Sequence, residues 1–346
     1  MLTPDYLDGL PEPIVKILQN VEDFMIGDIA RRMRKVGDAT STAEIQRIAL
    51  QTMGESTKAI NAKIAEAMGM TQKEVAQIFA QSEQVVTDNQ AQIFEAVGIK
   101  QDLGFAKRIG QAAVQSAMGD LSNLTRTMGY PTNSGQFTLW TDAYRQALGF
   151  AQMQVATGAI DYNTAIRQAI KPFTARGLCS VNYASGRVVS IEAAARQCII
   201  GGVSDMANAI GEKNAKDFGA DGWEISAHGD CAPDHEAAQG RQYSNKEYEA
   251  LNSLLARPIG TLGCRHSAYP ILMGISGRAY SDARLAEMKR KNAEGITYEG
   301  RHYTGYEATQ MQRQIERSIR KTKRELIGAD KAGLKDDFMT SSIKLR

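Results

Sequence analysis

The sequence predicts an α+β protein: a predominantly helical N-terminal half, then a mixed C-terminal domain with short hairpins and a long final helix. No proline occurs between Ile14 and Tyr130, which leaves helices free to run. Apolar residues in that half recur at the three-and-four spacing of a helical face. Beyond Cys179, alternating segments and glycine turns typical of hairpins appear.

These changes in pattern predict the domain organisation. A chain of 346 residues is long enough for two domains of ordinary size. We expect a helical domain over residues 1–135, a helical connector over 136–178 and an α+β domain over 179–346.

Proline and capping signals predict where the N-terminal helices begin. The first begins at Pro13, and one face carries Ile14, Leu18, Val21, Met25, Ile29 and Met33. Three capping boxes predict further helix starts, so we expect four or more helices: Ser41 with Glu44, Thr71 with Glu74, and Thr87 with Gln90.

The middle of the chain continues as two helices and then changes. We expect helices over 137–158 and 161–177, with Pro172 kinking or ending the second. The following segment alternates through Val181, turns at Ser185 and Gly186, and leads into a helix capped by Ser190.

The last third contains a strand, a hairpin and a helix. Residues 222–226 read as a strand, and residues 296–304 as a hairpin that turns at Glu299 and Gly300. Thr304 with Glu307 forms the capping box of the final helix.

Composition excludes several classes of protein. With 43% hydrophobic residues the chain can build a core, and its net charge of +2 means that any affinity for nucleic acid needs a local patch. Four scattered cysteines indicate free thiols. No apolar run is long enough to span a membrane, and acids replace the basic start of a secretion signal, so we expect a protein kept in the cytoplasm.

Histidine and cysteine gather in two short segments. The first contains His228, Cys231 and His235, and the second contains Cys264 and His266. Imidazole and thiolate are the ligands that zinc prefers, so one interpretation is a zinc site built from both segments.

Two other interpretations of this cluster stay open. The histidines could satisfy backbone carbonyls in a polar core, with Cys264 as a small buried residue. Catalysis would use Cys264 as a nucleophile, or zinc with Asp234 or Glu236 moving protons. No established nucleophile, deaminase, metalloprotease or nucleotide-binding motif occurs, so we expect no enzyme and no packaging ATPase.

The final helix is strongly basic. Facing a single acid, Glu316, it carries Arg313, Arg317, Arg320, Lys321, Lys323 and Arg324. These cations could neutralise DNA phosphates without reading sequence, or form a solvated helix face.

Several segments resemble the minor capsid proteins of tailed phages, which are related to the Mu F-like head-morphogenesis proteins. The resemblance is densest in "WEISAHGDCAPDHEAAQGRQYS", "GCRHSAYPILMGIS" and "TYEGRHYTGYEATQMQRQIERSIRKTKREL". Its pattern includes His228, Pro233, His235, Gln239, Gly240, Cys264, Arg265 and His266. Many members have arginine where this chain has Ala232, and the Cys231 position varies, so His228, His235, Cys264 and His266 are the preferred four ligands.

The resemblance implies a virion component inside the head, made in the host cytoplasm and present in few but multiple copies. It implies the portal protein as partner, with the major capsid or scaffolding protein and packaged double-stranded DNA as further partners. The implied role is in head assembly, DNA packaging or genome ejection; the alternatives are a virion-carried enzyme or a sequence-independent DNA-binding protein. Relatives continue beyond the position of Arg346, which leaves open whether this chain is truncated or processed.

Overall fold

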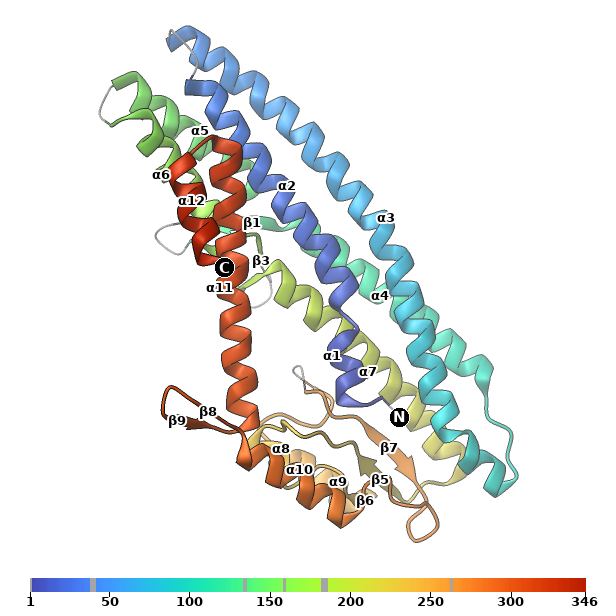
Figure 1. The fold of residues 1–346 in the computed structure, drawn as a ribbon. Helices are drawn as coiled ribbons and strands as arrows, with labels where there is room; N and C mark the ends of the chain where they lie inside the picture. The colour runs from blue at the N-terminus through green and yellow to red at the C-terminus, as the bar shows by residue number, and fades with distance from the viewer. Residues whose placement is uncertain (1, 38–41, 133–135, 158–159, 182–185, 262–263) are drawn as a thin grey trace. The chain divides into compact units, whose positions relative to one another are not determined.

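A computed structural model describes residues 2–37, 42–132, 136–157, 160–181, 186–261 and 264–346. Its helices make up most of the chain (Figure 1). In order they are α1 (Pro4–Gly9), α2 (Glu12–Gly37), α3 (Thr42–Val97), α4 (Leu103–Arg126), α5 (Trp140–Thr157), α6 (Tyr162–Arg176), α7 (Ile191–Phe218), α8 (Pro233–Glu236), α9 (Asn245–Leu254), α10 (Asp282–Glu294), α11 (Gly305–Ala332) and α12 (Lys335–Lys344).

The strands are short and form three antiparallel sheets. They are β1 (Met128–Pro131), β2 (Phe137–Leu139), β3 (Cys179–Val181), β4 (Val188–Ser190), β5 (Gly222–Ile225), β6 (Gln242–Ser244), β7 (Ala268–Ile271), β8 (Ile296–Tyr298) and β9 (Arg301–Tyr303). The sheet orders are β2-β1-β3-β4, β6-β5-β7 and β8-β9. The α+β class predicted from the sequence is confirmed. No helix among the described residues is long and apolar enough to cross a membrane.

The chain divides into two compact units, each assembled from separate stretches of sequence. Unit 1 contains Met1–Pro13, Gln72–Asp120 and Arg196–Arg313, and unit 2 contains Ile14–Thr71, Leu121–Ala195 and Gln314–Arg346. The three domains expected along the sequence stay a prediction.

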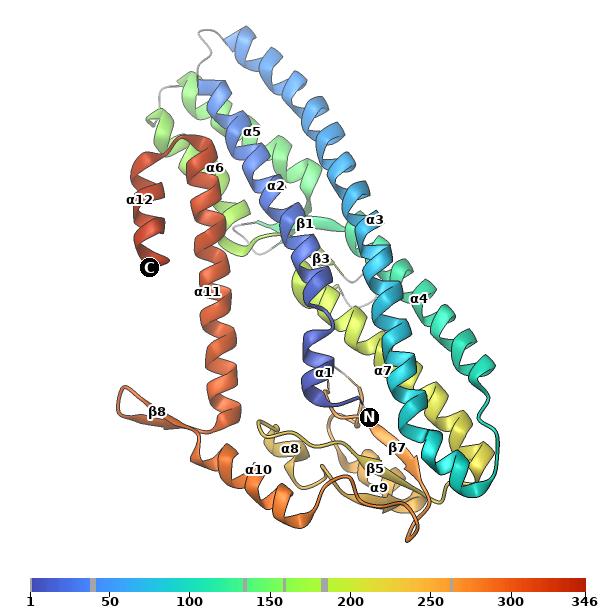
Figure 2. The ribbon, with the colours of Figure 1, turned by 45° about the vertical axis from the view of Figure 1, so that its right-hand side comes forward.

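Unit 2 contains the four-stranded sheet and an aromatic core. The six apolar residues predicted for one face of α2, from Ile14 to Met33, are at most 2% exposed. Helices α5 and α6 form a pair (Figure 2), and edge-to-face ring contacts join Phe173 of α6 to Tyr144 of α5 and to Tyr130 of β1. The Tyr144 hydroxyl donates a hydrogen bond to the carbonyl of Met25, which satisfies this buried hydroxyl.

A buried cluster of polar side chains also lies in unit 2. The carboxylate of Glu22 accepts a hydrogen bond from the Leu178 backbone N–H, and the Arg324 guanidinium lies 3.5 Å from it. Arg324 donates a second hydrogen bond to the Thr174 carbonyl. Burial, opposed by Arg324, raises the pKa of Glu22 to about 7. The C-terminal part of α11 is therefore fixed within unit 2 by charged groups.

Unit 1 is built around the three-stranded sheet, with β5 in the centre. Ile225, Ala238 and Ile259 form a small apolar cluster, against which Tyr243 and Tyr248 pack. The hydroxyl of Tyr269 in β7 donates a hydrogen bond to the carbonyl of Leu2, so the start of the chain belongs to the same unit.

The N-terminal half contains the helices α1 to α4, as expected, but two of the predicted helix starts are wrong. Thr71 and Thr87, predicted to cap new helices, lie inside the single long helix α3. The Thr87 hydroxyl instead donates to the carbonyls of Glu83 and Gln84, one turn back. A threonine can make this bond within a continuous helix, so the capping pattern alone did not mark a break. Ser41 lies outside the described residues.

Further along the chain, most predictions are confirmed and one is corrected. The pairs β3–β4 and β8–β9 form the expected hairpins, and β5 is the expected strand. The turn residue Ser185 lies outside the described residues. Residues 137–139, expected to be helical, form strand β2. Helix α6 continues through Pro172 to Arg176, so of the two expected effects this proline does not end the helix.

Candidate metal centre

The sheet of unit 1 brings the two His/Cys segments together. Strands β5 and β7 are antiparallel, with Ile225 paired to Ala268 at the end of the ladder. Beyond that pair, the Ser226 N–H donates to the Ser267 carbonyl at 2.9 Å, and the Ser267 N–H donates to Ser226 Oγ at 2.9 Å. The chain leaving β5 therefore lies beside the chain entering β7, which places the segments of His228 and His266 next to each other.

The short helix α8 positions His235. Pro233 is at its first turn, where the missing N–H costs nothing. The N–H groups of Ala238 and Gln239 then donate to the His235 carbonyl. Gly240 follows at φ +67°, and a Cβ there would lie 2.3 Å from Leu285 Cδ2. Only glycine combines this left-handed conformation with such close packing.

All five predicted donor side chains are buried together. The exposed fractions are 8% for His228 and 1% for both Cys231 and His235. They are 3% for Cys264 and 2% for His266. The donors fall into two groups of three that share His266, and within each group the ligand atoms lie within 4.8 Å of one another.

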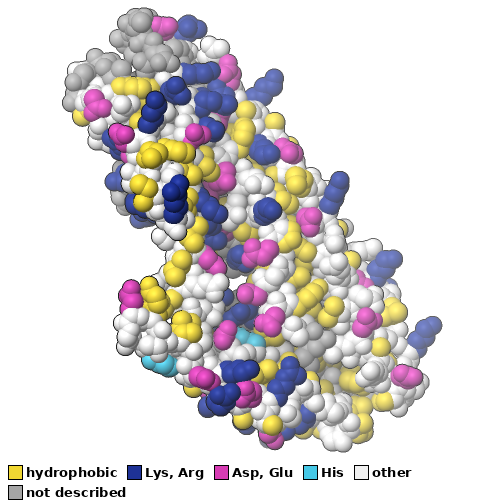
Figure 3. Space-filling view, viewed as in Figure 1, with side chains coloured by type: hydrophobic (Ala, Val, Ile, Leu, Met, Phe, Trp, Pro, Cys, Tyr) yellow, Lys and Arg dark blue, Asp and Glu magenta, His cyan; other side chains and the backbone are white. Residues whose placement is uncertain are grey.

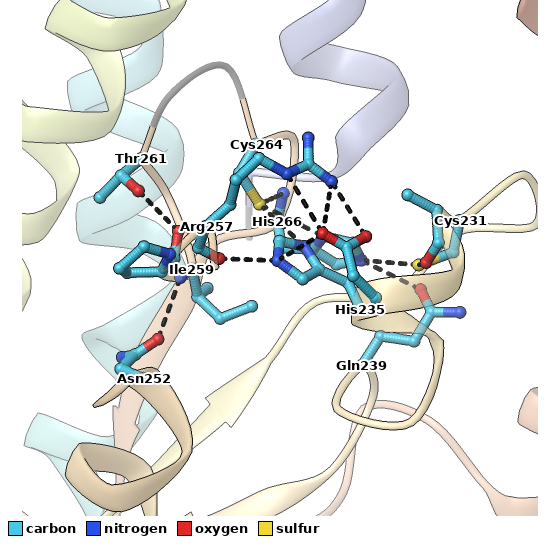
Figure 4. A network of polar contacts seen from close by, with 12 residues as sticks. Cys231, His235, Gln239, Asn252, Arg257, Ile259, Thr261, Cys264 and His266 are labelled. Carbon is cyan, nitrogen blue, oxygen red and sulfur yellow. Dashed lines mark hydrogen bonds and ion pairs between the residues drawn. The ribbon is translucent and has the colours of Figure 1, made fainter. Parts of the chain in front are cut away.

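The first group is His235, Cys264 and His266 (Figure 4). The Cys264 Sγ lies 3.4 Å from Nδ1 of His235 and 3.4 Å from Nδ1 of His266. His235 Nε2 lies 2.7 Å from the Arg257 carbonyl, which can only accept, so Nε2 carries the proton. A histidine whose second nitrogen donates to a carbonyl is the usual arrangement of a metal ligand.

The second group is His228, Cys231 and His266. The Cys231 Sγ lies 3.6 Å from His266 Nε2, across the ring from Cys264. The same thiol donates to the carbonyl of Ala232 at 3.3 Å. The His228 ring lies against the His266 ring with centroids 4.9 Å apart.

Burial and hydrogen bonding give these side chains different protonation states. It lowers the pKa of His228 to about 4 and that of His266 to about 3, so both imidazoles are neutral at pH 7. It raises the pKa of Cys231 to about 12. Burial also acts to raise the pKa of the Cys264 thiol, but the adjacent His235 imidazole and hydrogen bonds from backbone N–H groups outweigh it and lower that pKa. Cys264 is therefore the better thiolate.

The donor set fits a zinc ion. Zinc binds imidazole nitrogen and thiolate sulfur, and it requires that the ligand nitrogen and the ligand sulfur carry no proton. Nδ1 of His235 and Nδ1 of His266 face the sulfur of Cys264, and Nε2 of each ring has a hydrogen-bond acceptor. When bound, zinc would cross-link the segment after β5 to the segment before β7.

The chain matches a known protein family over nearly its whole length. The model of the family described as phage minor capsid protein 2 matches residues 2–346. The chain belongs to this family. No curated protein and no solved structure matches it. The resemblance to phage minor capsid proteins is thus confirmed, and this minor capsid protein is a component of the virion.

The predicted DNA-contacting cations of the minor capsid protein have different surroundings. Arg320 forms an ion pair with Glu192 at 2.9 Å, and the Arg324 side chain is only 11% exposed beside Glu22. Arg313 is 42% and Lys321 52% exposed, and Arg317 is exposed. On the face shown in Figure 3, basic and acidic side chains are interspersed.

Two groups that orient the centre were given no role by the sequence. One is the Arg257 carbonyl, which no sequence pattern could reveal because it is a backbone atom. The other is Gln239, whose Oε1 lies 3.1 Å from His266 Nε2. The sequence indicated Gln239 only as a member of the family pattern, four residues after His235, and gave it no role.

Proposed function

We propose that this minor capsid protein binds the portal protein inside the phage head and assists head assembly, packaging or ejection. The family match over residues 2–346 carries the proposal. A minor component is present in few copies, whereas a symmetric shell repeats each of its sites many times. A few-copy protein therefore needs a unique site, and the portal vertex is the unique site of a tailed-phage head.

Co-purification with the portal ring tests this proposal. The protein and its portal protein are co-expressed, and the portal ring is isolated by size. We expect the minor capsid protein to be retained in a fixed ratio below the portal copy number, and to be absent from shells of major capsid protein alone. Binding to the shell but not to the ring would contradict the proposal.

We also propose that a zinc ion bound by the His/Cys cluster stabilises unit 1 and has no catalytic role. Burial of all five donors supports this, because a substrate would have to reach side chains that are at most 8% exposed. The alternative of a virion-carried enzyme requires an open coordination position.

Metal analysis of the purified chain tests the zinc proposal. We expect about one zinc per chain. A His266→Ala variant should lose it, whereas a variant of the exposed His302, which lies on β9 outside the cluster, should keep it. Absence of zinc from the wild type would contradict the proposal. A water molecule as fourth ligand would favour the enzyme.

Direct contact with packaged DNA is a second candidate, favoured by the exposure of Arg317 and Lys321 one turn apart on α11. Replacing both with glutamine should reduce the salt dependence of DNA binding by about one phosphate contact each. The same change at Lys331, which is 53% exposed on the same helix, is the matched control. Equal effects from both variants would contradict a specific contact by Arg317 and Lys321.

A further inference from the structure

The two nitrogens of His266 face different cysteines. Nδ1 lies 3.4 Å from Cys264 Sγ, and Nε2 lies 3.6 Å from Cys231 Sγ. A neutral imidazole has one protonated nitrogen and one with a free lone pair, and only the second can bind a metal. The two groups of donors that share His266 therefore compete, and the tautomer of His266 decides between them.

Gln239 determines this tautomer. Its side chain is 5% exposed, and its Oε1 accepts a hydrogen bond from the His228 backbone N–H at 3.0 Å. Because a backbone N–H can only donate, the atom that faces it is the amide oxygen and not the amide nitrogen. The same oxygen lies 3.1 Å from His266 Nε2 (Figure 4). Nε2 must then donate, which leaves the lone pair on Nδ1.

We propose that Gln239 is the positioning residue that directs the metal to Nδ1 of His266, so that Cys264 and not Cys231 is the thiolate ligand. The inference rests on the metal centre of the proposed function. Both His235 and His266 then present Nδ1 to one sulfur, and each donates its Nε2–H to an oxygen of the chain.

The surroundings of the two cysteines agree with this assignment. The backbone N–H of His266 donates to Cys264 Sγ at 3.4 Å, which stabilises a negative sulfur. Cys231 Sγ instead faces the carbonyl of Ala232 at 3.3 Å, which accepts and so keeps the proton on the thiol. Cys231 therefore lies close to the metal centre as a protonated thiol, which is not a metal ligand.

The first experiment compares the two cysteines in the full-length chain. Zinc affinity is measured by competition with a chromophoric chelator. We expect Cys264→Ala to lose at least a hundredfold in affinity and Cys231→Ala to stay near the wild-type value. Equal losses would overturn the inference and leave the zinc proposal standing, whereas a wild type that binds no zinc would overturn the zinc proposal itself.

The second experiment tests Gln239. Gln239→Met keeps the size but removes the acceptor, and should lower zinc affinity by about 10- to 100-fold, as loss of a ligand's hydrogen-bond partner does. Cys231→Ala should lower affinity further in that background only. Gln239→Glu keeps the acceptor and should bind zinc almost as the wild type does.

Nitrogen-15 NMR of the metal-free chain reads the tautomer of His266 directly and needs no metal binding. We expect Nε2–H in the wild type and in Gln239→Glu, and a mixture of tautomers in Gln239→Met. An Nδ1–H tautomer in the wild type would overturn the inference. Should Gln239→Met fail to fold, the wild-type tautomer and the two cysteine variants still decide.

Discussion

The two compact units each contain a buried polar cluster, and the clusters are stabilised in opposite ways. In unit 2, Glu22 has its opposite charge within the chain, because Arg324 lies 3.5 Å away and Leu178 donates an N–H. In unit 1, His235 and His266 direct Nδ1 lone pairs at the sulfur of Cys264. The first cluster is complete in itself, whereas the second gains most from a cation that the sequence does not encode.

This difference shows what a buried polar group requires. A buried charge is tolerated when it is paired and hydrogen-bonded, and a set of converging lone pairs is tolerated when it coordinates a metal. The first cluster should therefore respond to pH and not to chelators, and the second should respond to chelators.

The largest expected effect is that of zinc on unit 1. At a free zinc concentration about a thousand times its dissociation constant, binding stabilises the folded state by about 4 kcal/mol. Thermal melting with and without a chelator measures this gain. His266→Ala should abolish it, whereas Arg324→Met should leave it intact. If a chelator still lowers the melting temperature of His266→Ala, the contrast between the two clusters is wrong.

The second largest expected effect is the pH dependence of the unfolding free energy that Glu22 causes. Its pKa is about 7 in the folded chain and 4.5 ordinarily, because burial favours the neutral carboxyl. The stabilisation by the protonated form is fully present below pH 4.5 and is lost as the pH rises through 7, at about 1.4 kcal/mol per unit of pKa difference. Denaturant unfolding between pH 5 and 8 should show this slope.

A neutral side chain at position 22 provides the control. Glu22→Gln should flatten the slope, and Glu249→Gln at an exposed site should not change it. If the slope is the same in Glu22→Gln as in the wild type, another group causes it.

The third effect concerns the turn that supports the metal centre. Gly240→Ala forces an alanine to φ +67° and places its Cβ 2.3 Å from Leu285 Cδ2. Gly274→Ala imposes a similar φ of +74° with nothing within 4 Å. The backbone costs about 1–2 kcal/mol in both variants. Only Gly240→Ala should also weaken zinc binding, and Leu285→Ala should partly restore it. Equal zinc affinity in both glycine variants would contradict this.

The smallest expected effect concerns the capping box of α11, which lies outside both clusters. The Thr304 hydroxyl accepts from the Glu307 N–H, and the Glu307 carboxylate accepts from the Thr304 N–H, which completes the capping box of α11. Thr304→Ala should cost about 1 kcal/mol in unfolding free energy, with no dependence on zinc. Thr340→Ala, inside α12, is the comparison that should cost less.

The sequence was sufficient for the elements with strong local signals. Hairpin β8–β9 was predicted from Glu299 and Gly300, which do have positive φ. Strands β1 and β2 were missed because they are only four and three residues long, and pairing across the chain forms them more than alternation does. The continuity of α3 was missed because the same threonine can cap a helix or hydrogen-bond back inside one.

The candidate site shows a similar division. The five donors stood out because histidine and cysteine are rare elsewhere in the chain. Which nitrogen of each imidazole faces the sulfur depends on the Arg257 carbonyl and on Gln239. These contacts form only once the two segments lie side by side, so composition and spacing could not predict them.

The discontinuity of unit 1 determines when it can fold during synthesis. The carbonyl of Leu2 receives its hydrogen bond from Tyr269, and the same unit extends to Arg313. A ribosome needs tens of seconds to add that length of chain. Throughout that time the apolar Leu2 and Leu7, both buried in the finished fold, have no completed core to enter. Nascent chains of this protein should therefore depend on the host's chaperones until the last third of the chain has left the ribosome.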